Sequence, residues 1–192
     1  VNGKHYNAWH NGKQLWPSSA WTGTANASTS TLSQDGKVIA TNLLLSPKPR
    51  AADYSVNSSN DCAISDVANG MKVMALSSRV NPYAQRGGYT LAVGSYHLHA
   101  ELPEISGTHW MDMVCGFWSD IIPYPESIRN GVVDYDVTIS WKKTNLLFEL
   151  KTPLDGYAVW SHIGLYTAAD WAAMQALGIN WFSGDEYGKV SQ

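Results

Sequence analysis

Two histidines and a glutamate alternate with apolar residues in the middle of the chain, at His97, His99 and Glu101. Alternate residues of a β-strand point to opposite faces of a sheet, so these three polar side chains share one face. Imidazole and carboxylate groups at this spacing lie close enough to share one metal ion, and imidazole suits Zn, Cu, Fe or Ni. The same groups can instead hydrogen-bond a polar ligand.

A metal centre of the cupin type would need more than this strand supplies. Pro103 interrupts the strand shortly after the polar residues, and no second histidine motif follows. Polar residues on a solvated sheet face need no metal. We therefore expect no metal or other cofactor here and interpret the face as a surface for a polar ligand.

Tryptophans and an aspartate extend this polar and aromatic pattern. In residues 110–118 the side chains alternate, so Trp110, Asp112 and Trp118 share the face opposite an apolar set. The two tryptophans are eight residues apart, which is about 26 Å along a strand and suits the two ends of a groove. Trp160, in the last strand, is a third aromatic candidate. The candidate ligand-binding residues are His97, His99, Glu101, Trp110, Asp112, Trp118 and Trp160.

The composition supports an aromatic binding surface but allows a second explanation. Nine Trp and ten Tyr stand against three Phe, and Trp and Tyr favour half-exposed surfaces and interfaces. On a binding face the rings would stack on sugars while the polar groups bind hydroxyls. The alternative is a second hydrophobic layer, in which the tryptophans pack beneath the N-terminal arm or the C-terminal helix.

Charge and hydropathy narrow the choice of partners. The net charge of −3 offers no electrostatic footprint for nucleic acid, and no apolar run is long enough for a membrane span.

The two cysteines, Cys62 and Cys115, do not make a disulfide framework. Cys115 occupies a core position, which favours a buried free thiol over a bridge to Cys62.

Short alternating segments separated by turns predict an all-β fold, an antiparallel β-sandwich of the jelly-roll type. Residues 133–141 are the clearest strand, with Trp141 as its last inward residue. We divide the chain into an N-terminal hairpin and Ser/Thr-rich arm (1–35), the sandwich (36–166), and a C-terminal helix and tail (167–192). Asn11-Gly12 and Asn69-Gly70 indicate hairpin turns. One helix is expected over residues 168–177, capped by Thr167 and ended by Gly178.

Two pairs of segments resemble known families. NLLLSPKPRAADY and YTLAVGSYHLHAEL, with Asn42-Leu43-Leu44 and Gly94-Ser95-Tyr96, are similar to the opening and central strands of jelly-roll carbohydrate-binding modules, although Ser46 stands where Asn is usual. WSHIGLYTAADWAAMQALGINWFSGD resembles the end of minor tail or tail-tip proteins of phages and prophages of Gram-positive, especially actinobacterial, hosts, and the N-terminal NGKHYNAWHNGK is compatible with such proteins. The likeness covers roughly residues 37–185.

These resemblances imply a non-catalytic carbohydrate-binding domain on a virion tail or other extracellular surface, made in the bacterial cytoplasm. Its partners would be a host cell-surface glycan and other tail subunits, including copies of itself in a homo-oligomer. Such sugar-binding modules often hold a structural calcium through an aspartate in the last strand. Here Ser161 and His162 stand in that place, so calcium is not expected from the last strand, although Asp53, Asp61 and Asp66 carry oxygens that suit it.

Two other functions stay open. The domain could serve tail assembly alone, with its aromatic face and arm making subunit contacts and no sugar bound. It could also be a jelly-roll polysaccharide hydrolase or lyase. The sequence has no G-x-S-x-G elbow, no phosphate-binding glycine loop and no H-E-x-x-H helix, and no spacing requires a catalytic pair of carboxylates.

Overall fold

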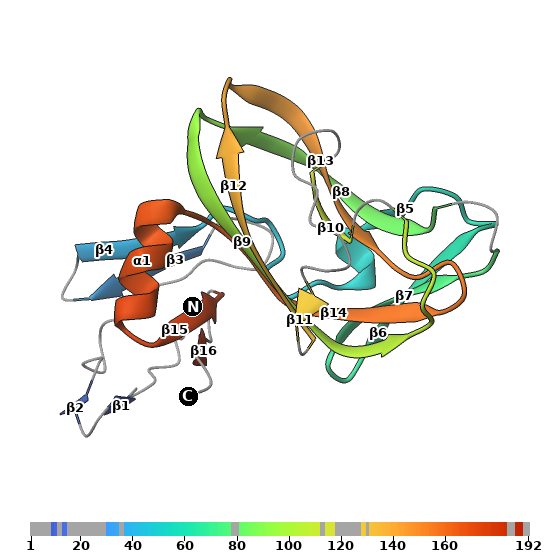
Figure 1. The fold of residues 1–192 in the computed structure, drawn as a ribbon, viewed down its shortest axis with the longest axis horizontal. Coiled ribbons are helices and arrows are strands. Elements are labelled where there is room, and N and C mark those ends of the chain that lie inside the picture. The colour runs from blue at the N-terminus through green and yellow to red at the C-terminus, as the bar shows by residue number, and fades with distance from the viewer. Residues whose placement is uncertain are drawn as a thin grey trace.

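The computed structural model describes residues 9–10, 13–14, 30–34, 37–77, 81–111, 114–117, 128–129, 131–183 and 187–189. It confirms an all-β sandwich built from antiparallel sheets, with one short helix among the described residues (Figure 1). The larger sheet has the order β11-β12-β9-β14-β7-β6 and the smaller has the order β10-β13-β8-β5.

The strands of the larger sheet are β6 (Cys62–Val67), β7 (Gly70–Ala75), β9 (Gly94–Ser106), β11 (Ile128–Arg129), β12 (Val132–Ile139) and β14 (Tyr157–Thr167). Those of the smaller sheet are β5 (Ser55–Val56), β8 (Tyr83–Leu91), β10 (Cys115–Phe117) and β13 (Lys143–Lys151). A 3₁₀ turn, η1 (Ala51–Asp53), precedes β5.

The order in which strands pair is that of a jelly roll. β7 pairs with β14, β8 with β13, and β9 with β12, so the pairs are nested around the centre of the chain. Rolling this nested ribbon places β14 beside β9 and β13 beside β10, which joins the pairs into two sheets. Closing two sheets by a double Greek key is how a jelly roll is built.

The main core lies between the two sheets. On β9 the apolar face is buried as the alternation predicts, at Tyr96, Leu98, Ala100 and Leu102. The smaller sheet contributes Phe117 and Phe148, which meet edge to face with ring centroids 5.2 Å apart. Cys62 and Cys115 are both buried in this core as free thiols, so no bridge joins them.

A second, smaller core lies beside the sandwich. It contains Leu32, Ala40, Tyr166, Met174, Ile179 and Phe182. These residues come from β3 (Ser30–Gln34), β4 (Lys37–Asn42), the end of β14, α1 (Ala168–Ala176) and β15 (Ile179–Phe182), which pairs with β16 (Tyr187–Lys189). Figure 1 shows β3, β4, α1 and β15 together, on the side of the sandwich away from β5 and β6. The strand at 37–42, which the sequence division assigns to the sandwich, therefore packs with the C-terminal helix.

Local sequence accounts for the helix. The Thr167 side chain accepts a hydrogen bond from the backbone N–H of Asp170 at 3.1 Å, which is the predicted N-cap. Gly178 takes a φ of +69°, the left-handed conformation expected just after the last turn. The Asp170 carboxylate also accepts from the backbone N–H of Thr41 at 3.0 Å. That bond explains why β4 belongs to the second core.

Both hairpins expected from Asn-Gly pairs are present. β1 (Trp9–His10) pairs with β2 (Lys13–Gln14), on either side of Asn11-Gly12. β6 pairs with β7 up to Val67 and Gly70. Residues 15–29 of the predicted arm lie outside the described residues.

Candidate functional site

Two irregularities in the pairing of β9 with β14 decide which side chains reach the outer face of the larger sheet. Val159 of β14 pairs with Glu104 of β9, and Ser161 pairs with Glu101. A step of two residues on β14 therefore matches a step of three residues on β9. Between Ser161 and Gly164, β14 advances three residues for two of β9. The additional residue on β14 is His162, whose φ of +46° is in the left-handed region. Such β-bulges turn a side chain to a new direction.

The bulge places His162 against Glu101. His162 Nδ1 lies 2.7 Å from Glu101 Oε2, and the imidazole packs on Trp181 of β15 with ring centroids 4.2 Å apart. The Trp181 indole N–H in turn donates to the backbone carbonyl of Ile163 at 2.9 Å. His162 is therefore held by Glu101 of β9 on one side and by Trp181 of β15 on the other.

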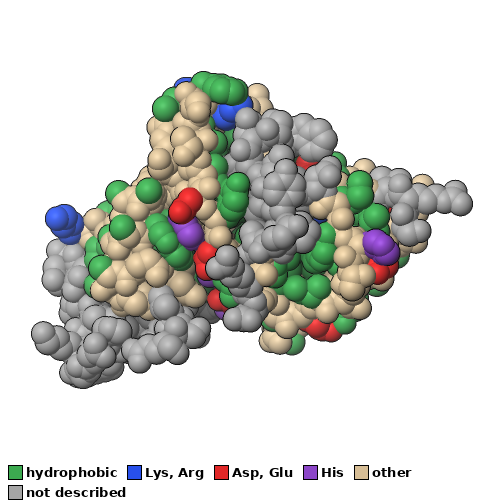
Figure 2. Space-filling view, viewed as in Figure 1, with side chains coloured by type: hydrophobic (Ala, Val, Ile, Leu, Met, Phe, Trp, Pro, Cys, Tyr) green, Lys and Arg blue, Asp and Glu red, His purple; other side chains and the backbone are tan. Residues whose placement is uncertain are grey.

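Glu101 belongs to a series of histidines and carboxylates that crosses three strands, β12, β9 and β14. His99 Nε2 lies 3.8 Å from Glu101 Oε1, and His99 Nδ1 lies 2.7 Å from Asp134 Oδ1. The same Asp134 oxygen lies 3.2 Å from His97 Nε2, and His97 Nδ1 lies 2.7 Å from Asp136 Oδ1. We call this series, from Asp136 to His162, the histidine–carboxylate row; its members are Asp136, His97, Asp134, His99, Glu101 and His162. Figure 2 shows histidine and acidic side chains side by side on the surface.

The second core covers the middle of the row. Trp171 of α1 stacks on His97 with ring centroids 3.9 Å apart and an interplanar angle of 9°, and its ring centroid lies 5.9 Å from that of His99. His99 is only 1% exposed, and its Nε2 has no hydrogen-bond partner within the described part of the chain. The face that the alternation predicts to be solvated is therefore buried at His97 and His99, because α1 packs on it.

The histidines of the row favour the ionised form of two carboxylates, Glu101 and Asp134. Burial alone would raise the pKa of Glu101, but the His162 hydrogen bond and the nearby His99 ring outweigh it and lower that pKa to about 2. Burial likewise opposes ionisation of Asp134, yet His97 and His99 hold its pKa below the usual value. Burial lowers the pKa of His99, and the two neighbouring carboxylates more than reverse this, so it is raised overall. The carboxylates of Glu101 and Asp134 are thus ionised acceptors at neutral pH.

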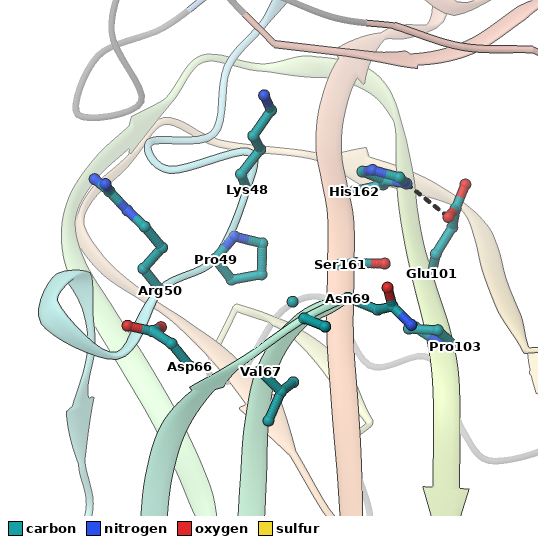
Figure 3. A pocket seen from close by; sticks show the side chains of 12 residues that line it. Lys48, Pro49, Arg50, Asp66, Val67, Asn69, Glu101, Pro103, Ser161 and His162 are labelled. Atoms are coloured by element: carbon teal, nitrogen blue, oxygen red, sulfur yellow. Dashed lines mark hydrogen bonds and ion pairs between the residues drawn. The ribbon is translucent and has the colours of Figure 1, made fainter.

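Beyond Glu101 and His162 the surface opens into a pocket of about 610 Å³ (Figure 3). This volume falls within the range of about 300–1,000 Å³ that is usual for small-molecule sites. Three segments line the pocket: the loop after β4, the hairpin between β6 and β7, and the bulged region of β9 and β14. The lining residues are Lys48, Pro49, Arg50, Asp66, Val67, Ala68, Asn69, Gly70, Glu101, Pro103, Ser161 and His162.

Short-range contacts hold the pocket walls in place. The Asp66 carboxylate accepts from the backbone N–H of Ala51 at 2.7 Å, which ties the β6–β7 hairpin to the loop after β4. Arg50 Nε lies 3.3 Å from Asp53 Oδ2 on the same loop. Gly70 has a φ of +139°, and a Cβ there would lie 2.2 Å from the backbone oxygen of Trp160. Only glycine therefore lets the hairpin approach β14 closely enough to form this wall.

The structure separates the sequence-predicted site residues. Glu101 lines the pocket, whereas His97 and His99 lie beneath Trp171. Trp110 is half-buried and packs against the main core. Asp112 and Trp118 lie outside the described residues.

Trp160 is not on a ligand face. Its side chain is 0% exposed in the main core, and its indole N–H donates to the backbone carbonyl of Lys151 at 2.9 Å. The prediction assumed unbroken alternation from Val159 to Ile163, but the bulge at His162 adds one residue between them. Ile163 therefore lies on the same core side as Trp160.

Several pocket residues, including His162, Lys48 and Asn69, are not among the site residues predicted from the sequence. For His162 a signal exists: apolar residues at Trp160, Ile163 and Leu165 have spacings of three and then two. A spacing of three within a strand indicates a bulge. No comparable signal exists for the loop residues, which reach the pocket through contacts between distant segments.

A scan against protein-family models and a search of curated proteins find no match to this chain. In the part of the chain that the structure describes, no group of three or more His, Cys, Asp or Glu side chains is placed to hold a metal ion. The described helix is also too short to cross a membrane. The function must therefore be inferred from the pocket and its surroundings.

Proposed function

We propose that the chain is a non-catalytic carbohydrate-binding domain that recognises a host-surface glycan as part of a phage or prophage tail protein. The observation that carries the proposal is the 610 Å³ pocket, whose lining combines hydrogen-bonding side chains with short apolar ones. A sugar presents hydroxyl groups that both donate and accept hydrogen bonds, together with apolar C–H faces. A concave site with a few well-placed polar groups suits such a ligand.

Glu101 is the central polar group of this proposal. Its carboxylate is kept ionised and is oriented by His162 on one side and His99 on the other. A fixed carboxylate accepts hydrogen bonds from neighbouring hydroxyls, and bonds to a charged acceptor are about twice as strong as neutral ones. Asn69, which points into the same space in Figure 3, adds an amide that can donate and accept.

The proposal relies on hydrogen bonding rather than on aromatic stacking in the pocket. Among the described residues, the pocket lining contains two prolines, Val67 and Ala68 but no Trp, Tyr or Phe side chain. Trp181 lies beneath His162 and is 1% exposed, so it supports the site without facing a ligand. The rigid β-scaffold below the site reduces the entropy lost when a ligand binds.

The test is retention on a glycan array and on purified host cell walls. We expect Glu101→Gln, which keeps the side-chain shape, to weaken binding about 10-fold or more. Asn69→Ala should weaken it about 5-fold. Asn60→Ala is the matched control, because Asn60 is exposed in a turn outside the pocket. Thermal melts of each variant separate loss of binding from loss of folding.

Two outcomes contradict the proposal. If the wild type binds no glycan and no host wall, the domain is better explained as a tail-assembly module. If it binds a glycan but folded Glu101→Gln and Asn69→Ala variants bind equally well, the pocket is not the site. Release of reducing ends or unsaturated sugars from a bound glycan would instead indicate an enzyme.

A further inference from the structure

Two short connections between the sheets lie next to each other at one corner of the sandwich. Residues 92–93 connect β8 to β9, and residues 140–142 connect β12 to β13. Gly94 pairs with Ile139, and Leu91 pairs with Lys143, so the register brings the two connections together. Figure 1 shows these ends of β9 and β12 at the top of the molecule. We call residues 92–93 and 140–143 the hairpin tip.

The hairpin tip exposes apolar groups beside cations. Trp141 is 62% exposed and Val93 is 63% exposed, and Trp141 is the one exposed aromatic side chain found among the described residues. Lys143 Nζ lies 4.0 Å from the centre of the Trp141 ring, and Lys142 is exposed next to it. Figure 2 shows hydrophobic and basic side chains together at the top of the view. Trp141 was predicted to point inward, but β12 ends at Ile139 and Trp141 lies in the exposed connection that follows.

We propose that the hairpin tip is a second contact site of this domain, and that it binds an acidic polysaccharide. This inference rests on the proposed glycan-binding function. Trp141 offers a flat apolar ring on which a sugar face can stack, and Lys142 and Lys143 place positive charge where a carboxylate or phosphate substituent would lie. The main core does not need Trp141, because its ring is mostly in solvent.

Magnitudes favour this partner over a lipid surface. Each Lys near an anionic membrane contributes about 1 kcal/mol, so two lysines and one tryptophan give only marginal attachment. Stable membrane anchoring needs stronger or combined signals, such as two lipid chains or one chain with a polybasic patch.

Size argues against a large protein partner. A specific protein interface buries about 800 Å² on each side. A fully buried tryptophan contributes about 250 Å² at most, and the hairpin tip exposes one partly covered tryptophan and one valine as its large apolar groups. A polysaccharide, in contrast, needs only one exposed aromatic ring for each sugar unit that stacks on the protein.

A second site on one polymer would act by multivalency. Once the pocket holds one part of a chain, the hairpin tip meets another part at high effective concentration. Binding of a long glycan should then depend on both sites, whereas binding of a short oligosaccharide in the pocket should depend on the pocket alone.

The test compares immobilised polygalacturonate and poly(glycerol phosphate) as acidic chains with dextran as a neutral chain, measured by surface plasmon resonance at low and high salt. We expect tighter wild-type binding to at least one acidic chain than to dextran. Trp141→Ala should weaken that binding about 10-fold, and Trp141→Tyr should restore most of it. Lys142→Gln should weaken it about 3-fold and reduce its salt dependence. Val38→Ala, at an exposed apolar position on β4, is the matched control.

The outcomes distinguish this inference from the proposed function. Two results would show that the hairpin tip is not the contact. One is that the wild type binds dextran and the acidic chains with equal affinity. The other is that a folded Trp141→Ala variant binds the acidic chain with wild-type affinity. In either case the proposed function survives, provided that Glu101→Gln loses binding to a glycan or host wall. Absence of wild-type binding to every glycan and host wall overturns both.

Discussion

At the scale of single residues, Asn42 joins the two cores. It is fully buried at the end of β4, at the start of the Asn42-Leu43-Leu44 segment. Its side-chain amide forms hydrogen bonds with three segments: the loop before β5, the end of β14 and the end of β15. Oδ1 accepts from the backbone N–H of Leu44 (3.1 Å) and Leu165 (3.2 Å). Nδ2, which carries two N–H groups, has three acceptors within hydrogen-bond distance: the carbonyls of Ile163 (3.2 Å) and Phe182 (3.1 Å) and the hydroxyl of Tyr166 (3.3 Å).

Replacing Asn42 should therefore destabilise the whole chain. Asn42→Leu keeps the side-chain volume but leaves several buried backbone groups without partners, and each such group costs about 1–3 kcal/mol. We expect a loss of roughly 2–4 kcal/mol in the free energy of unfolding and a fall in Tm of about 5–15 °C. Urea unfolding and calorimetry measure both quantities. Asn60→Ala, exposed in a turn, should change stability by less than about 0.5 kcal/mol, and an equally small effect of Asn42→Leu would contradict this account.

The shared face of the polar residues on β9 was predictable, but most of the pocket residues and the direction of several side chains were not. The alternation at His97, His99 and Glu101 correctly puts them on one face, because β9 is regular from Gly94 to Glu101. Trp160 and Trp141 fail for two different reasons. After Trp160, a bulge shifts the alternation of side chains between the two faces of β14 by one residue. Trp141 lies beyond the end of β12, where the alternation no longer applies. Alternation holds only while pairing is regular, and a sequence shows the pairing of its strands only indirectly.

At the scale of elements, the histidine–carboxylate row joins β12, β9 and β14 and makes stability depend on pH. Glu101 has a folded pKa of about 2 against a usual 4.5, so its contribution is complete above about pH 4.5 and is lost as pH falls toward about 2. The pKa of His99 is raised above its usual 6.5, so its contribution is complete below that pH and is lost as pH rises through the folded value. The row therefore stabilises the fold most between about pH 4.5 and 6.5.

Urea unfolding from pH 3 to pH 8 tests this window. The wild type should be most stable between about pH 4.5 and 6.5, with losses on both sides. Glu101→Gln should flatten the acidic side, and His99→Gln should flatten the alkaline side. Glu104→Gln, at an exposed position on the same strand but outside the histidine–carboxylate row, is the control variant. A wild-type curve that rises steadily from pH 4.5 to pH 8 would be inconsistent with a stabilising protonated His99.

Elements defined by neighbouring residues were easier to predict than those defined by distant ones. The helix follows from its own cap, alanines and glycine, and the structure has it at Ala168–Ala176. The position of β4 depends on a bond from Thr41 to Asp170, which is 129 residues away in sequence. The burial of His97 and His99 depends on Trp171 in the same way. No local pattern reports such contacts.

At the scale of the whole molecule, nested pairing makes the jelly roll depend on contacts between distant segments. The first and last strands of the nest, β7 and β14, lie side by side in the larger sheet. Each sheet buries its inner face only against the other, so neither is expected to be stable alone. The main core should therefore unfold as one cooperative unit.

The two free cysteines can report on that cooperativity. Cys62 lies on β6, at an edge of the larger sheet, and Cys115 lies on β10, at an edge of the smaller one. Burial raises the pKa of Cys62 to about 11 and raises that of Cys115 well above its usual value. Since the thiolate is the reactive form, neither should react with Ellman's reagent in the folded protein. A reducing agent should also leave Tm unchanged, because no disulfide is present.

In low concentrations of guanidinium the two thiols should become reactive at the same rate, because both are released only when the main core opens. The single variants Cys62→Ala and Cys115→Ala assign each rate to one thiol. If Cys62 reacts faster, β6 opens by itself, and the pocket wall that β6 and β7 form would open with it. A faster Cys115 would instead place the weak edge at β10, in the sheet away from the pocket. Equal rates would mean that the pocket persists for as long as the main core does, as a preformed binding site requires.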